Sequence, residues 1–513
     1  MSMVAAANTD GILSTAQADA AVLPGQTLLR DGDHIVFCGD SITCHSWKNA
    51  SGCCHLVTNA LSAAGTARRV TVTGLGFCGN TVVNWLHREM ATRPADAKPA
   101  FSNEHGNEFP AQDVKKTLDG RVDVLAVLLG MNDILMPAVE EGEKSLDEWM
   151  ARYRELAANL RSRTHARVLL LGTFTPLTAD PDGPKNKVRE LMNERVRKLA
   201  AELGAHVWEA GPAAYETIVE TRRRDPAYRE APDFVHPGKL GHMAMAAAFC
   251  RAVGEPKAAE YLDKRRAELL DEMLPPKPAV SYRLFPRSLG ESDADRLAFD
   301  LCWNVCGMEA ASVSLDLPEG WTAKPAKSVG KEGTVRLVGR PDRLANIVKI
   351  RATDGTSSAS AEVPVAAPWR VTTETGECRL ALATWDYLGK CSSGSVDLFQ
   401  VLFGGRTDAV VAERWIVCDR PQTFGFRIGS EAFSATQDFV VSLNGDPVWR
   451  GDLPRGRKLV EPEVKLNLRV GVNALSIRVG HREWQRHFTF DLVQAGGGDP
   501  SVLRYSWKPT NCR

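Results

Sequence analysis

Residues 35–41 read Ile-Val-Phe-Cys-Gly-Asp-Ser, and this segment gives the strongest indication of the fold of the first half of the chain. Four apolar residues in a row, followed by Gly39, are typical of a strand that is buried on both faces in a parallel sheet. A helical spacing of apolar residues follows over residues 54–61. Asp40 and Ser41 therefore stand where a buried strand gives way to a helix.

The same alternation of strand and helix continues to about residue 268. Further apolar runs of strand length occupy residues 70–73, 122–129, 167–172 and 206–208, and helical patterns occupy residues 146–160, 188–203 and 238–253. This order predicts a doubly wound, three-layer α/β/α domain with a parallel sheet. In such a sheet the functional site lies at the carboxyl ends of the strands.

The periodicity changes after a proline-rich segment at residues 274–278. Beyond it, apolar residues alternate at period two, which predicts β-strands. The length and spacing fit an immunoglobulin-like β-sandwich followed by a second sandwich of jelly-roll type, with a hairpin signal at Asn444-Gly445. We therefore expect an N-terminal extension, an α/β domain, a linker and two β-sandwiches, with limits at residues 1–25, 26–270, 271–279, 280–368 and 369–513.

Composition narrows the functional classes. The chain has 513 residues, with 63 Lys+Arg and 63 Asp+Glu, so its formal net charge is zero. This balance argues against nucleic-acid wrapping and polybasic membrane binding. No apolar stretch approaches the roughly 20 residues that a membrane-spanning helix needs. The 12 cysteines form no compact framework, which favours reduced thiols.

Two properties stay open at this point. Residues 1–25 have neither the charged start nor the apolar run of a signal peptide, so the compartment stays unknown, and without a leader the protein would be cytoplasmic. A leader ahead of this sequence would instead make it secreted or periplasmic. The oligomeric state is not predicted.

Four short segments carry the groups that nucleophilic acyl transfer needs. They are Gly39-Asp40-Ser41, Gly76-Phe77-Cys78-Gly79-Asn80, Gly130-Met131-Asn132-Asp133 and Asp233-Phe234-Val235-His236-Pro237. A serine hydroxyl needs an adjacent base, so we expect Ser41 to be the nucleophile, His236 the base and Asp233 the group that orients the imidazole. The backbone amides of Ser41 and Gly79 and the side-chain amide of Asn132 are the donors expected for the tetrahedral oxyanion.

In this order the four segments resemble the conserved blocks of the SGNH hydrolases, also called the GDSL esterase/lipase family. The resemblance covers the predicted α/β domain, about half of the chain. It implies the same three-layer fold and a catalytic triad of Ser41, Asp233 and His236. It also implies an oxyanion hole formed by Ser41, Gly79 and Asn132, and no cofactor.

Other polar residues near these segments have simpler interpretations. Asp40 and Asp133 are expected to cap or brace loops rather than to react. Cys44 and Cys78 are expected to pack near the site. His242 is expected to be a surface or packing residue. The histidines lack the paired spacing of metal ligands, so no catalytic metal is expected.

Two long polar stretches, residues 85–120 and 215–232, are expected to form loops that shape the substrate pocket. They contain no long apolar run of the kind expected for a lipid-binding lid. Eight of the 12 tryptophans lie beyond residue 300. Exposed rings would stack on sugars, but most of these tryptophans are expected in the cores of the sandwiches.

The resemblances in the second half indicate a substrate class. Residues 315–321 resemble the sandwich modules that accompany glycoside hydrolases, and residues 439–492 resemble galactose-binding-like jelly rolls. An SGNH domain followed by such modules resembles bacterial carbohydrate esterases, which implies removal of O-acetyl groups from a sugar or polysaccharide. Two alternatives remain: a broad or lipolytic esterase that acts on non-sugar acyl esters, and a non-catalytic glycan-binding protein.

Overall fold

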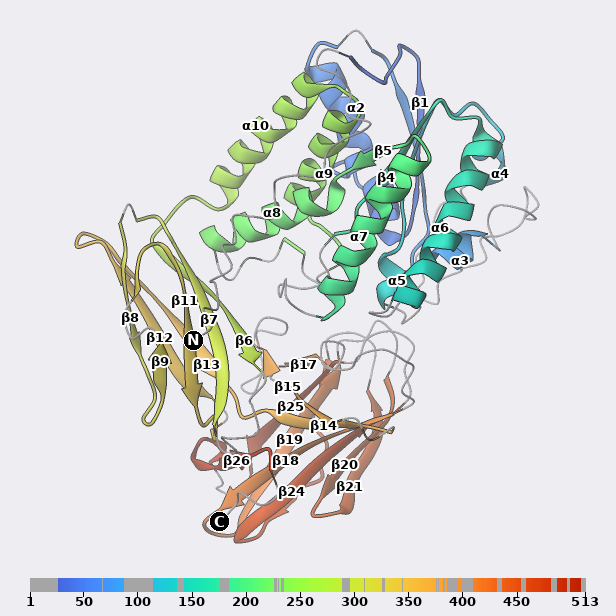
Figure 1. Ribbon diagram of the computed structural model, residues 1–513. Coiled ribbons are helices and arrows are strands. Elements are labelled where there is room, and N and C mark those ends of the chain that lie inside the picture. Colours follow the sequence, from blue (N-terminus) through green and yellow to red (C-terminus); the bar gives the residue numbers. More distant parts are fainter. Residues whose placement is uncertain are drawn as a thin grey trace, which may run out of the picture.

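The computed structural model has an α/β part followed by two parts built of β-strands (Figure 1). It describes residues 26–508 apart from these gaps: 67, 87–113, 136–142, 176–183, 226–227, 229, 232–234, 288–295, 309, 325–327, 344, 375, 377, 382, 385–394, 398–408, 431–435, 454–457, 481–486 and 496–498. Each of the three parts has a hydrophobic core of its own. The domain limits expected from the sequence stay a prediction.

A five-stranded parallel sheet in the order β2-β1-β3-β4-β5 forms the centre of the α/β part. Its strands are β1 (His34–Gly39), β2 (Thr71–Gly76), β3 (Val124–Leu128), β4 (Val168–Gly172) and β5 (His206–Trp208). Every residue of β3 and β4 is buried, as continuous apolar runs predict. The register pairs Gly39 with both Gly76 and Leu128, so the carboxyl ends of β2, β1 and β3 lie level.

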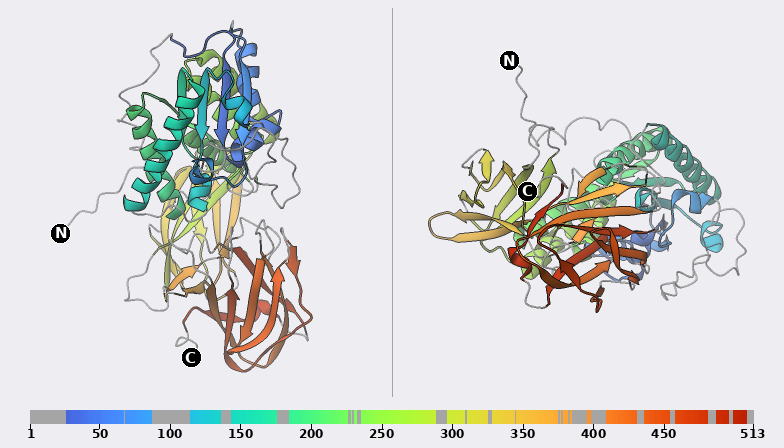
Figure 2. Two further views of the ribbon diagram at one scale, coloured as in Figure 1. Left: turned by 90° about the vertical axis from the view of Figure 1, so that its right-hand side faces the viewer. Right: turned by 90° about the horizontal axis from the view of Figure 1, so that it is seen from below.

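Helices cover both faces of this sheet, and the predicted three-layer arrangement is confirmed. On one side α2, α8, α9 and α10 pack together, and on the other α6 packs with α7 (Figures 1 and 2). The helices are α1 (Ser41–Lys48), α2 (Cys53–Ala63), α3 (Val82–Asn84), α4 (Val114–Leu118), α5 (Met131–Leu135), α6 (Glu143–Thr164), α7 (Pro184–Glu202), α8 (Ala210–Arg224), α9 (Lys239–Ala252) and α10 (Pro256–Met273).

The structure corrects the expectation of a loop over residues 215–232, because α8 continues to Arg224. The buried positions of α8 include Ala214, Thr217 and Thr221. These small side chains allow close packing but lack the large apolar residues that make a helix visible in the sequence. In the other expected loop, residues 114–118 are helical, and residues 87–113 lie outside the described residues.

The middle β part consists of two sheets, in the orders β10-β8-β12-β13 and β6-β7-β11-β9. The pairs within both sheets are antiparallel. Its strands are β6 (Ala279–Arg287), β7 (Leu297–Cys306), β8 (Ser312–Asp316), β9 (Thr322–Lys324), β10 (Ser328–Val329), β11 (Glu332–Gly339), β12 (Asn346–Thr353) and β13 (Ser358–Val365).

The C-terminal β part has two further antiparallel sheets, so the prediction of two β-sandwiches is confirmed. One runs β15-β14-β18-β24-β20-β21, with β26 paired to β18, and the other runs β16-β17-β25-β19-β22, with β23 paired to β19. The strands are β14 (Trp369–Thr373), β15 (Cys378–Ala381), β16 (Ala383–Thr384), β17 (Ser395–Asp397), β18 (Val410–Cys418), β19 (Gln422–Ser430), β20 (Thr436–Leu443), β21 (Asp446–Leu453), β22 (Lys458–Val460), β23 (Leu466–Leu468), β24 (Gly471–Val479), β25 (His487–Gln494) and β26 (Arg504–Ser506), with a short 3₁₀ helix, η3 (Pro500–Val502), before β26.

Most tryptophans of the two sandwiches belong to their interiors. Five are buried: Trp303, Trp321, Trp369, Trp415 and Trp507. Trp449 is half-buried, and Trp385 and Trp484 lie outside the described residues. The expectation that most of these rings pack in cores is therefore confirmed for the described residues.

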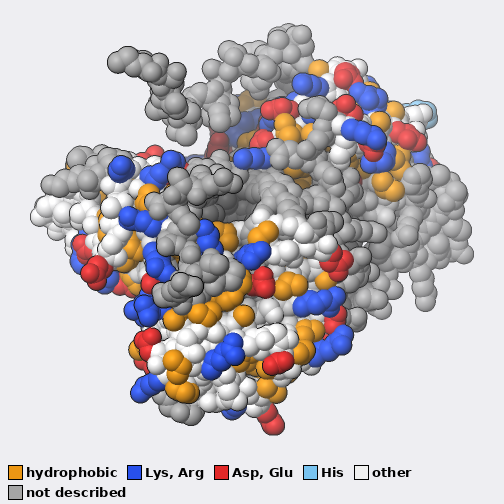
Figure 3. Space-filling model, turned by 60° about the horizontal axis from the view of Figure 1, so that its bottom comes forward, with side chains coloured by type: hydrophobic (Ala, Val, Ile, Leu, Met, Phe, Trp, Pro, Cys, Tyr) orange, Lys and Arg blue, Asp and Glu red, His pale blue; other side chains and the backbone are white. Residues whose placement is uncertain are grey.

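The described surface of the β parts mixes charges of both signs with small groups of apolar side chains (Figure 3). Such dispersed charge is typical of a protein surface in contact with water. No helix in the described part of the chain is long and apolar enough to cross a membrane.

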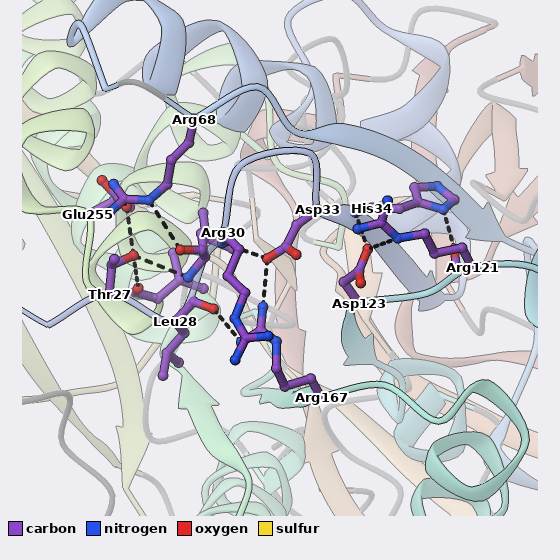
Figure 4. Close-up of polar contacts among 12 residues, drawn as sticks. Thr27, Leu28, Arg30, Asp33, His34, Arg68, Arg121, Asp123, Arg167 and Glu255 are labelled. Atoms are coloured by element: carbon purple, nitrogen blue, oxygen red, sulfur yellow. Dashed lines mark hydrogen bonds and ion pairs between the residues drawn. The ribbon is translucent and has the colours of Figure 1, made fainter.

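At the amino ends of the strands, ionic side chains tie the entering segment to the sheet (Figure 4). The guanidinium of Arg167 donates to Oδ2 of Asp33 and to the carbonyl of Leu28, both at 2.7 Å. The same Oδ2 accepts from the backbone amide of Arg30, also at 2.7 Å. Because Asp33 is only 1% exposed, water cannot easily replace these partners.

We expect Asp33→Ala to lower the free energy of unfolding by about 2–4 kcal/mol, because the guanidinium of Arg167 and the amide of Arg30 lose a shared buried acceptor. Urea unfolding followed by tryptophan fluorescence measures the change. Asp31→Ala is the matched control, since the Asp31–Arg69 pair is exposed, and we expect it to leave the unfolding midpoint unchanged. Equal effects of the two substitutions would contradict the role given to Asp33.

Candidate active site

Ser41 is the first residue of α1 and follows β1 after a single intervening residue, Asp40. Oδ1 of Asp40 accepts a hydrogen bond from the amide of Ile42 at 3.0 Å, so the expected capping role of Asp40 is confirmed. The abrupt change from strand to helix places Ser41 at the carboxyl edge of the sheet. Its side chain is sheltered, because the residue is 7% exposed.

His236 lies far from Ser41 in the sequence but next to it in the structure. Its Nε2 lies 2.7 Å from Oγ of Ser41, although 195 residues separate the two in the sequence. The loop that carries His236 is held by Glu230, which sequence reasoning missed. The Glu230 carbonyl accepts from the amide of Gly238, and its Oε1 accepts from the amide of Gly241, both at 2.6 Å. Glu230 therefore fixes the start of α9 and, with it, the position of the imidazole.

The sequence contains one signal for this role of Glu230. The N-cap residue of α9 is Gly238, which has no side chain with which to accept from the first amides of the helix. A carboxylate shortly before such a helix is a natural acceptor for them. Asp233, the third expected residue of the triad, lies outside the described residues, so its hydrogen bond to His236 stays a prediction.

The turn after β2 carries Gly79, whose φ of +78° lies in the left-handed region that favours glycine. Asn132 lies in the short helix α5 that follows β3, and it is 4% exposed. Its Nδ2 donates to the carbonyl of Asn80 at 3.0 Å, which ties α5 to the residue after Gly79. The structure thus joins the segments that carry two of the expected oxyanion donors.

Close packing brings this turn against α1. A side-chain carbon added to Gly76 would lie 2.1 Å from the backbone nitrogen of Cys44, so only glycine fits where β2 ends. The turn and the helix that begins at Ser41 are therefore neighbours. The expected oxyanion donors come from three strand ends that the sheet register sets side by side.

Two buried carboxyl groups support this edge of the sheet. The carboxylate of Asp133 accepts from the amide of Val82, with the nearer oxygen at 3.2 Å, and so holds the start of α3 behind the turn. Burial raises the pKa of Asp133 to about 7. Burial likewise raises the pKa of Asp40 to about 6, while its hydrogen bond from Ile42 and the charge of His236 act in the opposite direction. The structural role expected for Asp133 is confirmed.

Two thiols and two further histidines lie near the site. A hydrogen bond between Cys44 and Cys78 lowers the pKa of the Cys44 thiol and raises that of Cys78.

His242 is buried, and burial together with the charges of His45 and His236 lowers its pKa to about 4. The packing role expected for His242 is therefore confirmed. The ring of His45 packs on the ring of His236, a contact that sequence reasoning did not predict.

Within the described ranges, no three His, Cys, Asp or Glu side chains come together in a way that could hold a metal ion. The groups gathered around Ser41 are a base, hydrogen-bond donors and buried carboxyl groups. Such a set can activate a hydroxyl and stabilise negative charge on a carbonyl oxygen.

Comparison with known proteins identifies a family and several relatives to which part of this chain is similar. Residues 37–244 match the profile of the GDSL-like lipase/acylhydrolase family. An acetylxylan esterase of Geobacillus stearothermophilus is 24% identical over 227 residues, which cover 44% of this chain and 94% of that enzyme. A crystal structure of an acetylxylan esterase from the same organism matches with 22% identity and a TM-score of 0.32, covering 44% of this chain and 95% of that one. An α/β hydrolase from the metagenome of Lake Arreo, Spain, matches with 19% identity and a TM-score of 0.33, covering 45% and 99%.

A parallel sheet with a hydrogen-bonded serine and histidine at its carboxyl edge is an arrangement typical of hydrolases of the serine type. Residues 37–244 of the α/β part match the GDSL-like lipase/acylhydrolase family, the family that the sequence motifs resemble. This match supports a carboxylic ester hydrolase.

The raised pKa of Asp133 predicts how stability depends on pH. Its pKa is about 7 in the folded protein, against 3.8 for an ordinary aspartate. Between these values the folded protein keeps a proton that the unfolded chain releases, so this contribution to stability is present below about pH 4 and is lost as the pH rises through about 7. We expect Asp133→Asn, which cannot titrate, to make the free energy of unfolding less dependent on pH in this window.

Urea unfolding of the wild type and of Asp133→Asn at a series of pH values measures this effect. The asparagine oxygen can still accept from Val82, so the turn keeps its support and the two proteins differ mainly in titration. Parallel stability curves across the window would contradict a buried, protonated Asp133.

Proposed function

We propose that this protein is a serine esterase that removes acetyl or other short acyl groups from a carbohydrate or polysaccharide. The observation that carries the proposal is the 2.7 Å hydrogen bond between His236 Nε2 and Ser41 Oγ at the carboxyl edge of the sheet. The carbohydrate substrate is supported by the acetylxylan esterase to which this chain is similar.

In the proposed first half-reaction, Oγ of Ser41 attacks the carbonyl carbon of the ester while Nε2 of His236 takes the hydroxyl proton. The negative charge that develops on the carbonyl oxygen is stabilised by the amides of Ser41 and Gly79 and by the side chain of Asn132. Collapse of the tetrahedral intermediate breaks the bond to the sugar oxygen, which receives the proton from His236. An acyl group then remains on Ser41.

In the proposed second half-reaction, water attacks the acyl group and gives its proton to His236. The tetrahedral intermediate collapses, Ser41 recovers its proton and the carboxylic acid leaves. Asp233 would accept a hydrogen bond from Nδ1 of His236 and so keep Nε2 free to take protons in both half-reactions.

The surroundings of Ser41 fit a small acyl group better than a long chain. Ser41 is 7% exposed, and the described side chains of Asp40, Asn80 and Asn132 beside it are polar and buried. A long hydrocarbon chain would gain little free energy of burial against these polar side chains, because the gain depends on apolar contact area. An acetyl group would cover only a small area of them.

A panel of esters tests the proposal: acetylated xylose or xylan, acetylated pectin fragments and nitrophenyl esters of increasing chain length. We expect acetate release from the sugars, rates that fall beyond short acyl chains, and no activity in Ser41→Ala. A preference for long chains would instead indicate a lipolytic esterase, and activity that survives in Ser41→Ala would rule out this nucleophile.

Asn132 offers a second test of the same site. We expect Asn132→Ala to lower kcat by about 10²-fold or more with a much smaller change in KM, because an oxyanion donor acts mainly in the transition state. Steady-state kinetics on nitrophenyl acetate measure both constants, and a melting curve shows whether the variant is folded. A loss confined to KM would contradict the oxyanion role.

A further inference from the structure

The helix that begins with Ser41 also supplies a ring that contacts His236. His45 lies four residues after Ser41 on α1, and residues at this spacing share one face of a helix. The centroids of the His45 and His236 rings are 4.5 Å apart, with an angle of 32° between the ring planes. A single helix therefore carries both the hydroxyl that His236 contacts through Nε2 and a flat surface against its ring.

This contact restricts how the His236 ring can turn. The hydrogen bond to Ser41 holds one nitrogen of the imidazole but leaves the ring plane some freedom to tilt about the Cβ–Cγ bond. A second ring packed against it removes this freedom, because aromatic rings at about 4.5–7 Å attract one another. His45 is half-buried, so it is held in place but can still exchange protons with water.

The contact is also electrostatic. When His236 takes the proton of Ser41 it becomes a cation, and the face of a neutral imidazole next to it is a favourable surface. A protonated His45 would instead oppose a second positive charge on His236. The two rings therefore influence each other's protonation.

Other charged and titratable groups face this pair. On α1 and at its start these are Asp40 and Cys44, with Lys48 acting on Cys44, and on α9 it is His242. Asp40 interacts with the charge on His236, and His242 interacts with the charges on both His45 and His236. Because His242 is buried and its pKa is lowered to about 4, it stays neutral near pH 7 and adds no charge of its own.

We propose that His45 is a positioning residue for the catalytic base, which holds the plane of the His236 imidazole against α1 and, when protonated, opposes protonation of His236. This inference rests on the proposed esterase function and adds a residue outside the four sequence segments that carry it. The ring of His45 supplies the positioning, and its charge supplies the effect on pH dependence. The two contributions can be separated by substitution.

The variants His45→Phe and His45→Ala make this separation. Phenylalanine keeps a flat ring but cannot be charged, whereas alanine removes both properties. His55→Phe is the matched control, because His55 on the neighbouring helix α2 also packs on an aromatic ring, that of Trp47, and is not part of the site. Melting curves of all variants show whether they are folded.

Two measurements report how well His236 acts as a base in each variant, across the pH range of about 5 to 9 where histidines titrate. One is kcat and KM for nitrophenyl acetate, and the other is the rate at which a fluorophosphonate labels Ser41. The second readout depends on the activated serine but not on the identity of the natural substrate.

We expect His45→Ala to lower kcat and the labelling rate about three- to tenfold with little change in KM, and His45→Phe to stay within about twofold of the wild type. In His45→Phe the acidic limb of kcat/KM should move to higher pH by roughly half a unit, because one positive charge near His236 is gone. His55→Phe should leave the limb unchanged.

An unchanged acidic limb in His45→Phe, or a wild-type labelling rate in His45→Ala, would overturn the inference. A shift of the limb in His55→Phe as large as in His45→Phe would overturn it as well, since the effect would not be specific to the contact. A wild-type protein that neither hydrolyses the ester nor reacts with the fluorophosphonate would overturn the proposed function, and the role of His45 with it.

Discussion

The burial of β1 on both faces is the constraint on which the rest of the α/β part depends. The strand is hydrogen-bonded on both sides, to β2 and to β3, and its residues from Ile35 to Cys38 are at most 2% exposed. The backbone amides and carbonyls of such a strand are hydrogen-bonded to its neighbours, and its side chains are shielded from water. Chemistry can therefore begin only where the strand ends, and Gly39, Asp40 and Ser41 follow at that point.

The polar groups behind the site are buried, and their hydrogen bonds explain why they are tolerated there. Asp40, Asp133 and Glu230 each accept from backbone amides at the start of a helix, namely α1, α3 and α9. A buried carboxyl group costs free energy unless it is hydrogen-bonded, and helix starts supply unpaired amides. The same bonds that satisfy these groups fix the elements that carry Ser41, Gly79 and His236. The geometry of the candidate site and the capping of the helices are thus parts of one arrangement.

The sequence predicted β1, β3 and β4 well because these strands are continuous apolar runs. Residues 35–38 and 122–129 lie within one or two residues of β1 and β3 as observed. The contact of Ser41 with His236 was predicted from motifs, since spacing alone cannot bring together residues 195 positions apart. Glu230 and His45 were missed because their roles depend on which groups meet after folding. Helix α8 was missed because its buried positions are small and polar rather than large and apolar.

Side-chain and backbone contacts join the three parts of the chain. The guanidinium of Arg414 is buried 4.3 Å from the ring of Trp369 and 5.4 Å from that of Tyr505, and Trp507 packs in the core of the middle sandwich. The C-terminal segment therefore joins both sandwiches. The middle sandwich in turn packs β6 and β7 against α8, the helix that follows β5.

The parallel strands point toward the C-terminal sandwich (Figure 2), so their carboxyl ends face the β-rich half. This placement sets the β-rich half beside the edge of the sheet that carries Ser41 rather than at the amino ends of the strands.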